Sequence, residues 1–303
     1  MSTQMNRVNS IVCRLLSVAQ GLAFLAVGGA TGAQTTAGDA KRGEYLSKAA
    51  GCVGCHTSEK KDAIPYAGGR GLKSPFGTFY GPNITPHAEA GIGKWSEADF
   101  VRAMREGKRP DGANYFPAFP YPSFNAITDA DLRDLWAYLR TLPANAQASR
   151  PHDVGFPYNV RLGVTLWKGL YFKPAVFTPD PKLSPELNRG AYLTTALGHC
   201  SECHTPRNFM GGPRRERFLA GGKGPEGKDI PNLTPAQLKK KWSDKDLSDF
   251  LSSGVTPDGD VPAEAMGEVI RNTTGMLTPD DLAAMIVYLR SLPAIADEPA
   301  TKK

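Results

Sequence analysis

Cys52-Val53-Gly54-Cys55-His56 and Cys200-Ser201-Glu202-Cys203-His204 are the two stretches that decide the fold of this 303-residue chain. In each, two residues separate a pair of cysteines, and a histidine follows at once. This spacing allows both sulfurs to reach the two vinyl groups of one haem, and it places the imidazole under the iron. The sequence therefore predicts two covalently bound haem c groups.

Cys-x-x-Cys pairs also occur in zinc sites and in redox-active disulfides. Zinc ribbons usually bring their two pairs within about 20 residues of each other, whereas these pairs lie about 148 residues apart. Neither alternative explains why a histidine follows both pairs. The fifth cysteine is Cys13, so no pair remains for a structural disulfide.

The two motifs belong to a longer repeat with the same offset. Matching segments follow one another in the same order in both halves: Arg42-Gly43-Glu44-Tyr45-Leu46 with Arg189-Gly190-Ala191-Tyr192-Leu193, Asn83-Ile84-Thr85-Pro86 with Asn232-Leu233-Thr234-Pro235, Trp95-Ser96 with Trp242-Ser243, and Tyr138-Leu139-Arg140 with Tyr288-Leu289-Arg290. An offset of this length is that of a whole domain, so the sequence predicts one domain written twice.

The repeated segments have the signals of helices. Ser96 with Asp99, and Ser243 with Asp246, place a capping hydroxyl and an acid where helix N-termini favour them. Apolar residues recur at i, i+3, i+4 and i+7 from Leu132 to Leu139, and again from Leu282 to Leu289, which indicates a terminal amphipathic helix in each half. Strand-like alternation is weak, so we expect an all-α fold.

The N-terminus has the layout of a secretory signal peptide. Arg7 and Arg14 precede an apolar stretch over residues 15–27, small residues follow up to Ala33, and the first acidic residue is Asp39. The apolar stretch is shorter than the ~20 residues of a membrane-spanning helix. We therefore expect cleavage near Ala33 and export to the periplasm, with retention of the segment as an anchor as the alternative.

A sixth iron ligand is expected for the second haem. Met266 lies twelve residues after Gly254 in Ala265-Met266-Gly267, where a thioether can close the iron; ordinary core packing is the alternative. The same count from Gly107 reaches Phe119, which cannot bind iron. For the first haem three alternatives remain: Met104 as ligand, an open or water-bound iron, and His87.

The haem motifs, Gly81-Pro82-Asn83-Ile84-Thr85-Pro86, Pro117-Ala118-Phe119-Pro120-Tyr121 and Phe156-Pro157-Tyr158-Asn159-Val160-Arg161 together resemble a known family. It is that of the cytochrome c subunits of periplasmic dehydrogenases, including alcohol and gluconate dehydrogenases, and the resemblance covers nearly all of residues 39–293. In these relatives a methionine commonly stands where this chain has Phe119, and three haem domains are often present.

The N-terminal layout, the repeat and the composition between the repeated units divide the chain into five parts. They are a signal peptide over residues 1–33, a first cytochrome c domain over 39–143, a connector rich in proline and aromatic residues over 144–185, a second such domain over 186–293, and a tail over 294–303. The resemblance implies that both domains are of class I, that the helix of Gly43 crosses the helix of Tyr138, and that Gly190 meets Tyr288 in the same way.

The resemblance implies a carrier that passes electrons from a dehydrogenase to a downstream cytochrome or oxidase of the respiratory chain. The protein then needs no catalytic residue of its own. The rival interpretation is a two-haem enzyme, a peroxidase or a sulfur-compound dehydrogenase, with a catalytic first haem; Phe119 supports it. A haem-dependent sensor is a third interpretation, for which we find no output element.

Charge says less about partners than the haem motifs do. The chain has 36 Lys and Arg against 30 Asp and Glu, and loss of the signal peptide lowers the net charge from +6 to +4. No nucleic-acid footprint is required, and peripheral association with a membrane is compatible with this balance. Lys239-Lys240-Lys241 and Arg214-Arg215 are either a docking site for an acidic partner or solvated surface.

Overall fold

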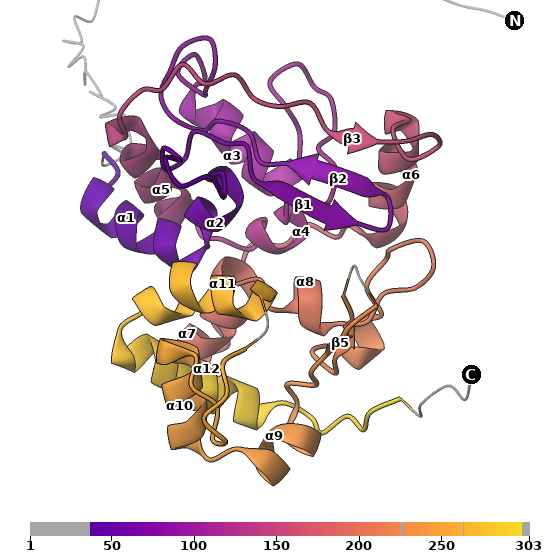
Figure 1. Cartoon of the computed structure of the whole chain (residues 1–303). Coiled ribbons are helices and arrows are strands. Elements are labelled where there is room, and N and C mark those ends of the chain that lie inside the picture. The colour runs from indigo at the N-terminus through magenta and orange to yellow at the C-terminus, as the bar shows by residue number, and fades with distance from the viewer. Residues whose placement is uncertain (1–36, 225–226, 263, 299–303) are drawn as a thin grey trace, which may run out of the picture. The chain divides into compact units, whose positions relative to one another are not determined.

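The computed structural model describes residues 37–224, 227–262 and 264–298. The predicted signal peptide over 1–33 and the last residues of the predicted tail lie outside the described residues. Helices dominate the rest (Figure 1), which confirms the prediction of a mostly helical fold. Among the residues described, no helix combines the length and the apolar character needed to cross a bilayer.

The elements of the first half are α1 (Ala40–Ala49), α2 (Cys52–His56), β1 (Gly71–Ser74), β2 (Gly77–Tyr80), α3 (Glu97–Glu106), α4 (Tyr121–Phe124) and α5 (Asp129–Thr141). Next come β3 (Asp153–Val154) and α6 (Arg161–Tyr171). The second half contains α7 (Pro185–Tyr192), η1 (Leu193–Leu197), α8 (Ser201–His204), η2 (Arg215–Arg217), β4 (Gly222–Lys223), β5 (Asp229–Ile230), α9 (Pro235–Lys241), α10 (Asp244–Ser253), α11 (Glu264–Asn272), η3 (Thr274–Met276) and α12 (Pro279–Ser291).

Short strands are the main departure from the all-α expectation. β1 and β2 pair antiparallel with Gly71 opposite Tyr80, and β2 also pairs with β3. β4 and β5 form a separate two-stranded ladder in the second half. These strands have two to four residues, too few for an alternating pattern to stand out in the sequence. They pair backbone groups in the long connections between helices.

Local sequence determines where the equivalent helices α3 and α10 of the two halves begin and end. Ser96 and Asp99 form a capping box at the start of α3, and Ser243 and Asp246 form one at the start of α10. Both helices end at a left-handed glycine, Gly107 or Gly254, which has no Cβ to oppose that conformation. The predicted helix starts are confirmed.

Two glycines let helix pairs cross at very short range. A Cβ on Gly43 of α1 would lie 1.9 Å from the carbonyl oxygen of Asp134 and 2.8 Å from the Cβ of Tyr138 on α5. A Cβ on Gly190 of α7 would lie 1.9 Å from the carbonyl oxygen of Ala284 and 2.8 Å from the Cβ of Tyr288 on α12. Both predicted crossings are confirmed.

The largest core cluster includes residues from both halves. Leu46, Met104, Leu132 and Leu135 of the first half belong to it together with residues 192, 193, 196, 197 and 285 of the second. A smaller cluster around Leu247, Leu282 and Ile286 lies within the second half. Because the larger core is shared, each half buries apolar surface that it would expose alone.

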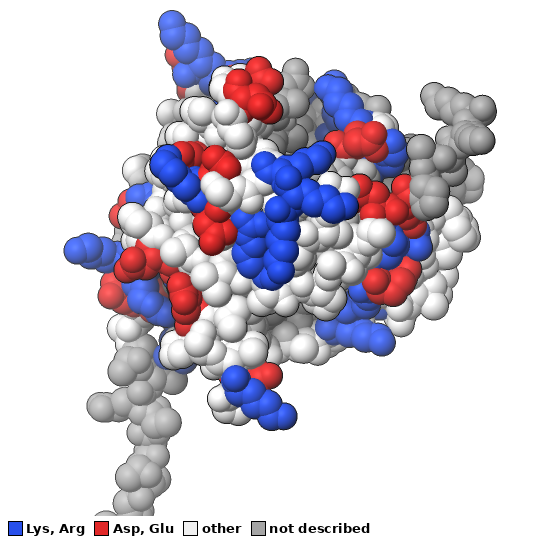
Figure 2. All heavy atoms as spheres, turned by 90° about the horizontal axis from the view of Figure 1, so that it is seen from below, with Lys and Arg blue, Asp and Glu red and all other residues white. Residues whose placement is uncertain are grey.

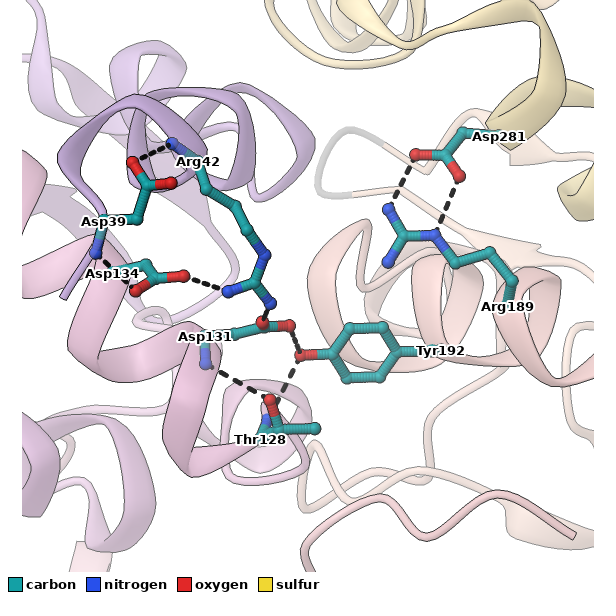
Figure 3. A network of polar contacts seen from close by, with 8 residues as sticks. All are labelled: Asp39, Arg42, Thr128, Asp131, Asp134, Arg189, Tyr192 and Asp281. Carbon is teal, nitrogen blue, oxygen red and sulfur yellow. Dashed lines mark hydrogen bonds and ion pairs between the residues drawn. The ribbon is translucent and has the colours of Figure 1, made fainter. Parts of the chain in front are cut away.

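A polar network repeats across the contact between the halves (Figure 3). Within the first half, Arg42 pairs with Asp131 and Asp134. Asp131 also accepts a hydrogen bond from the hydroxyl of Tyr192 in the second half, and that hydroxyl accepts one from the backbone N–H of Thr128 at 3.1 Å. The Tyr192 side chain thus joins α7 to the N-terminus of α5.

The reverse contact has the same form at the equivalent residues. Arg189 binds Asp281 through two hydrogen bonds of 2.7 Å. The hydroxyl of Tyr45 donates to Asp281 and accepts from the backbone N–H of Thr278 at 3.2 Å. Each half therefore gives a tyrosine to the N-terminus of the other half's last long helix, as in a two-fold symmetric interface.

The connector contacts both halves, as the aromatic pattern predicts. The ring of Phe172 packs edge-on against Tyr121 of the first half, with centroids 5.1 Å apart. The hydroxyl of Tyr171 accepts a hydrogen bond of 3.0 Å from Asn208 of the second half, and its carbonyl accepts one of 2.8 Å from Arg215. The connector is thus tied to the loop that follows α8.

Candidate haem sites

Helix α2 holds the first cysteine pair on a single turn. Cys52 and Cys55 are three positions apart, so their side chains share one face of the helix. The helix starts after Gly51, whose φ of 62° is left-handed. A Cβ at Gly51 would lie 2.7 Å from Oγ1 of Thr273, a residue of the second half. α8 presents Cys200, at its N-cap, and Cys203 in the same way.

Both motif histidines are oriented by a proline carbonyl. Nδ1 of His56 donates to the carbonyl of Pro82 at 2.7 Å, and Nδ1 of His204 donates to that of Pro231 at 2.8 Å. Burial lowers the pKa of both imidazoles, although the bonds to the carbonyls oppose this. A neutral ring with its proton on Nδ1 leaves Nε2 free to bind a metal.

The repeated Asn-x-Thr-Pro segments explain how those carbonyls are placed. Oδ1 of Asn83 accepts from the backbone N–H of Thr85 at 2.9 Å, and its amide donates to the carbonyls of Asn145 and Gln147. Asn232 makes the equivalent bonds to Thr234 and Ile295. A Cβ at Gly81 would lie 1.8 Å from the carbonyl oxygen of Cys55, so only glycine lets the first loop approach α2 this closely.

Met266 lies on α11, half-buried, and packs against the core cluster of the second half. Cys200 packs against the same cluster. The structure thus brings the predicted sixth ligand and one predicted thioether cysteine to one core.

Met104 lies on the inner face of α3 and is 5 % exposed. Cys52 and Phe119 both pack against the core cluster that contains it. The ring of Phe119 is held edge-on by Tyr115 and Phe124, with centroid distances of 5.4 and 5.8 Å. The structure therefore places the buried thioether of Met104 in the core cluster against which Cys52 packs. Phe119 occupies the position in the first half that Met266 has in the second.

His87 is part of a turn. Its Nδ1 accepts hydrogen bonds from the backbone N–H groups of Glu89, at 3.2 Å, and Ala90, at 3.0 Å. These bonds give the ring a structural role in the loop after Pro86.

The two motifs lie against each other's halves. α2 packs on α11, where a Cβ at Gly54 would lie 3.3 Å from Nδ2 of Asn272. Glu202 of the second motif accepts a hydrogen bond of 2.7 Å from Ser123 on α4. Burial raises the pKa of the Cys55 thiol, on which the charges of Arg70, Glu268 and Cys203 also act.

Arg70 was not singled out from the sequence. Its side chain is 15 % exposed and pairs with Glu59 and, across the two halves, with Glu268 at 2.9 Å. Its Nε is buried without a hydrogen-bond partner among the described residues. The only sequence signal for Arg70 is its place directly after Gly68-Gly69. The equivalent residue after Gly221-Gly222 in the second half is Lys223, which is exposed.

The residues present fit a haem at each motif. Four cysteines are free of disulfides, and both imidazoles are held with Nε2 available. A haem also carries propionates, and the buried, unpaired Nε–H of Arg70 is a donor suited to a carboxylate.

Comparison with known proteins agrees with this donor set. The family model described as cytochrome c matches residues 40–143. A protein of Cereibacter sphaeroides named diheme cytochrome c-type is 42 % identical over 296 residues, which cover 92 % of this chain and 99 % of that protein.

Two dehydrogenase subunits are also similar. The cytochrome c subunit of the quinone alcohol dehydrogenase of Gluconacetobacter polyoxogenes is 37 % identical, over 94 % of this chain and 63 % of that subunit. The gluconate 2-dehydrogenase cytochrome c subunit of Pantoea cypripedii is 37 % identical, over 84 % and 59 %. The chain thus spans about three fifths of these subunits. The resemblance drawn from the motifs is confirmed: the chain belongs to the cytochrome c family and carries two covalently bound haem c groups.

Proposed function

We propose that this protein is a periplasmic two-haem electron carrier that takes electrons from a dehydrogenase and passes them to a downstream cytochrome or oxidase. The names of the relatives support a dehydrogenase as the donor. The observation that carries the proposal is the pair of matched His–Pro carbonyl bonds, 2.7 and 2.8 Å long. They prepare an axial imidazole at both motifs, as a carrier with two redox centres requires.

Residues 39–143 and 186–293 are, in this proposal, two class I cytochrome c domains, and 144–185 connects them. The equivalent order of helices, the two glycine crossings and the reciprocal tyrosine contacts support this division. The signal peptide over 1–33 directs export.

The iron ligands and the thioether cysteines are, in this proposal, as follows. Cys52 and Cys55 form the thioethers of the first haem and His56 is its axial ligand; Cys200, Cys203 and His204 have these roles for the second. Met266 is the sixth ligand of the second haem, and Met104 is that of the first. Bound haem supplies an iron that cycles between Fe(II) and Fe(III); the chain's own residues attach it, orient the imidazoles and exclude water.

Electrons pass between the two centres within one molecule. The contact of α2 with α11 and the bond of Ser123 to Glu202 fix each motif against the opposite half. A rigid contact keeps the separation between redox centres constant, so that no docking step limits internal transfer.

The second candidate function is an enzyme with a catalytic first haem. The observation in its favour is Phe119, an aromatic side chain that cannot bind iron and packs between Tyr115 and Phe124. An open iron at this site would bind small ligands.

The absorption spectrum of the mature holoprotein, oxidised and reduced, separates these functions. Met104→Leu is the test variant, and Met285→Leu is the matched control because Met285 is buried to the same degree in the same core. The carrier is supported by three results: iron–sulfur absorption with the intensity of two methionine-ligated haems, no carbon monoxide binding, and loss of half of that absorption in Met104→Leu but not in Met285→Leu. Carbon monoxide binding to half the wild-type haem overturns it in favour of the enzyme.

Retention of both bands in Met104→Leu removes Met104 as the ligand. His87→Ala then shows whether the imidazole of His87 takes that place. N-terminal sequencing of the protein from a periplasmic extract tests export: we expect a start just after Ala33, and a membrane-bound chain that begins at Met1 contradicts cleavage.

A further inference from the structure

Helix α6 of the connector exposes a stripe of leucines to solvent, although Val164 on its other side is buried against Phe79 and Phe116. Leu162, Leu166 and Leu170, spaced four residues apart on one face, are 66, 64 and 60 % exposed. A helix on a protein surface ordinarily has the opposite orientation, with its apolar stripe against the core. Isolated exposed leucines are common, but an aligned stripe marks a contact surface.

The polar side chains of α6 hold the helix in this orientation. Arg161 donates to the carbonyl of Asn114 at 2.5 Å, and its guanidinium stacks over Phe116 at 4.7 Å. Lys168 donates to Oδ1 of Asn114 at 2.8 Å and to the carbonyl of Glu106. The side of α6 that carries Arg161, Val164 and Lys168 is therefore anchored on the first half, and the leucines on the other side are exposed.

Two glycines on α6 lack an internal reason. A Cβ at Gly163 or Gly169 would meet nothing within 4 Å. Glycine inside a helix costs about 1 kcal/mol relative to alanine. In the crossings at Gly43 and Gly190 the glycine permits close approach of another helix. Close approach of a partner protein's backbone to α6 would account for Gly163 and Gly169 in the same way. A lipid surface has no backbone that needs this space.

The exposed apolar surface continues towards the second haem site. The ring of Tyr158 lies 4.9 Å from that of Phe76, which contacts the position of a Cβ on Gly211 at 3.3 Å. Tyr171 at the end of α6 lies 3.6 Å from the sulfur of Met210. Figure 1 shows α6, the β1–β2 turn and the loop after α8 on the same side.

We call this surface the apolar edge; its exposed members are Phe156, Tyr158, Leu162, Leu166, Leu170, Phe209 and Met210. Phe209, the most exposed at 94 %, follows His204 by five residues. The apolar edge thus ends beside the thioether cysteine of the second haem site.

Cations outnumber carboxylates along the segments that form the apolar edge. Between Asp153 and Asp180 the chain has three cations and no carboxylate, and between Glu202 and Glu216 it has three more and none. Arg207 pairs with Glu202, and Arg214 pairs with Glu216, whereas Lys173 and Arg215 are exposed cations. Figure 2 shows one face of the molecule, on which acidic groups lie beside basic ones.

We propose that the apolar edge is the docking surface for the protein that exchanges electrons with the second haem, and that the partner's contact face is apolar with a rim of carboxylates. The proposal rests on the carrier function above. Apolar contact at the centre provides affinity, and opposite charge at the rim steers encounter.

The test measures reduction of the oxidised holoprotein by reduced flavodoxin, an acidic redox protein, in stopped flow. The variant Leu162→Ser/Leu166→Ser/Leu170→Ser removes the stripe. Ile64→Ser/Leu183→Ser is the control, because those side chains are also exposed, at 46 and 42 %, but lie outside the edge. We expect the second-order rate to fall about tenfold in the triple variant, which corresponds to about 1.4 kcal/mol, and to stay unchanged in the control. Arg215→Glu should weaken the dependence of the rate on ionic strength.

Ascorbate, which needs no docking surface, distinguishes the two levels of the proposal. Unchanged reduction by ascorbate with slowed reduction by flavodoxin supports the docking surface. Equally slowed reduction of the triple variant by both donors shows damage to the haems and overturns the docking surface as the cause, whereas a wild type that neither donor reduces counts against the carrier function itself. Equal flavodoxin rates in wild type and triple variant overturn the docking surface. So does sedimentation of wild type, but not of the triple variant, with phosphatidylglycerol vesicles, or a wild-type dimer that the triple variant abolishes.

Discussion

The two halves share a polar network and differ in how many carboxylates it holds. Arg42 of the first half pairs with Asp131 and Asp134, whereas Arg189 of the second pairs with Asp281, and Ala284 stands where the first half has Asp134. The extra carboxylate accepts the backbone N–H of Asp39 at 2.7 Å and so fixes the start of α1. Both helices also have a local cap, the side chain of Asp39 in α1 and that of Ser184 in α7. The distant carboxylate is thus an anchor that α1 has in addition to its cap.

A sharper difference concerns the iron. Met266 stands twelve residues after the glycine that ends α10, and Phe119 stands twelve after the glycine that ends α3. The first half offers instead Met104, buried on α3. If both methionines bind iron, the two halves reach the same coordination from different elements.

Met266→Ala should have the largest effect, because it removes a ligand from the iron itself. We expect loss of one iron–sulfur absorption band, new carbon monoxide binding at one haem, and a lower midpoint potential for that haem, since methionine ligation raises the potential. Absorption spectra and a redox titration measure this. Val269→Ala, on the same helix and exposed, should change neither; an intact band in Met266→Ala would refute the assignment.

Gly43→Ala and Gly190→Ala should each destabilise the fold by about 3 kcal/mol or more, because a methyl group 1.9 Å from a carbonyl oxygen forces the crossing helices apart. Urea unfolding of the holoprotein gives the free energies. The control is Gly163→Ala in α6, where nothing lies within 4 Å and a gain of about 1 kcal/mol is expected. Similar free energies for all three variants would show that the crossings are not tight.

Tyr192→Phe and Tyr45→Phe break the reciprocal contacts one at a time. Each loses a hydrogen bond to a carboxylate, for which we expect about 1.5–3 kcal/mol. The loss should be larger for Tyr192, which is buried, than for Tyr45, which is half-buried. Tyr158→Phe, at an exposed ring, should stay within about 0.5 kcal/mol of wild type. A larger loss for Tyr45→Phe than for Tyr192→Phe would show that burial does not decide the strength of these two hydrogen bonds.

The smallest effect is a pH dependence at Asp281. Burial acts to raise the pKa of this carboxyl, but Arg189 and Tyr45 outweigh it and hold the pKa below its ordinary value. The carboxyl thus contributes stability above its unfolded pKa of about 3.9, and this is lost as pH falls through the folded pKa. The free energy of unfolding should fall less steeply between pH 7 and pH 3 in Asp281→Asn than in wild type. Equal slopes for the two proteins would contradict the shift.

Short-range signals made much of the site predictable. Cysteine spacing, the adjacent histidines, the capping boxes and the glycine ends of α3 and α10 all depend on groups a few residues apart, whose geometry the chain fixes locally. The short strands and Arg70 were missed. The strands are too short to show a period, and the partner of Arg70, Glu268, is 198 residues away.

The sequence by itself determined two haem attachment sites, the repeat that contains them, and the apolar faces and ends of the main helices. Only the tertiary structure decided that Tyr45 and Tyr192 each bind the opposite half, that each motif lies against the opposite half, and that α6 presents leucines to solvent. A hydrophobic period says which side of a helix is apolar but not what covers it. That depends on which surfaces meet once the chain has folded: α6 is anchored by Arg161, Val164 and Lys168, with its leucines outward.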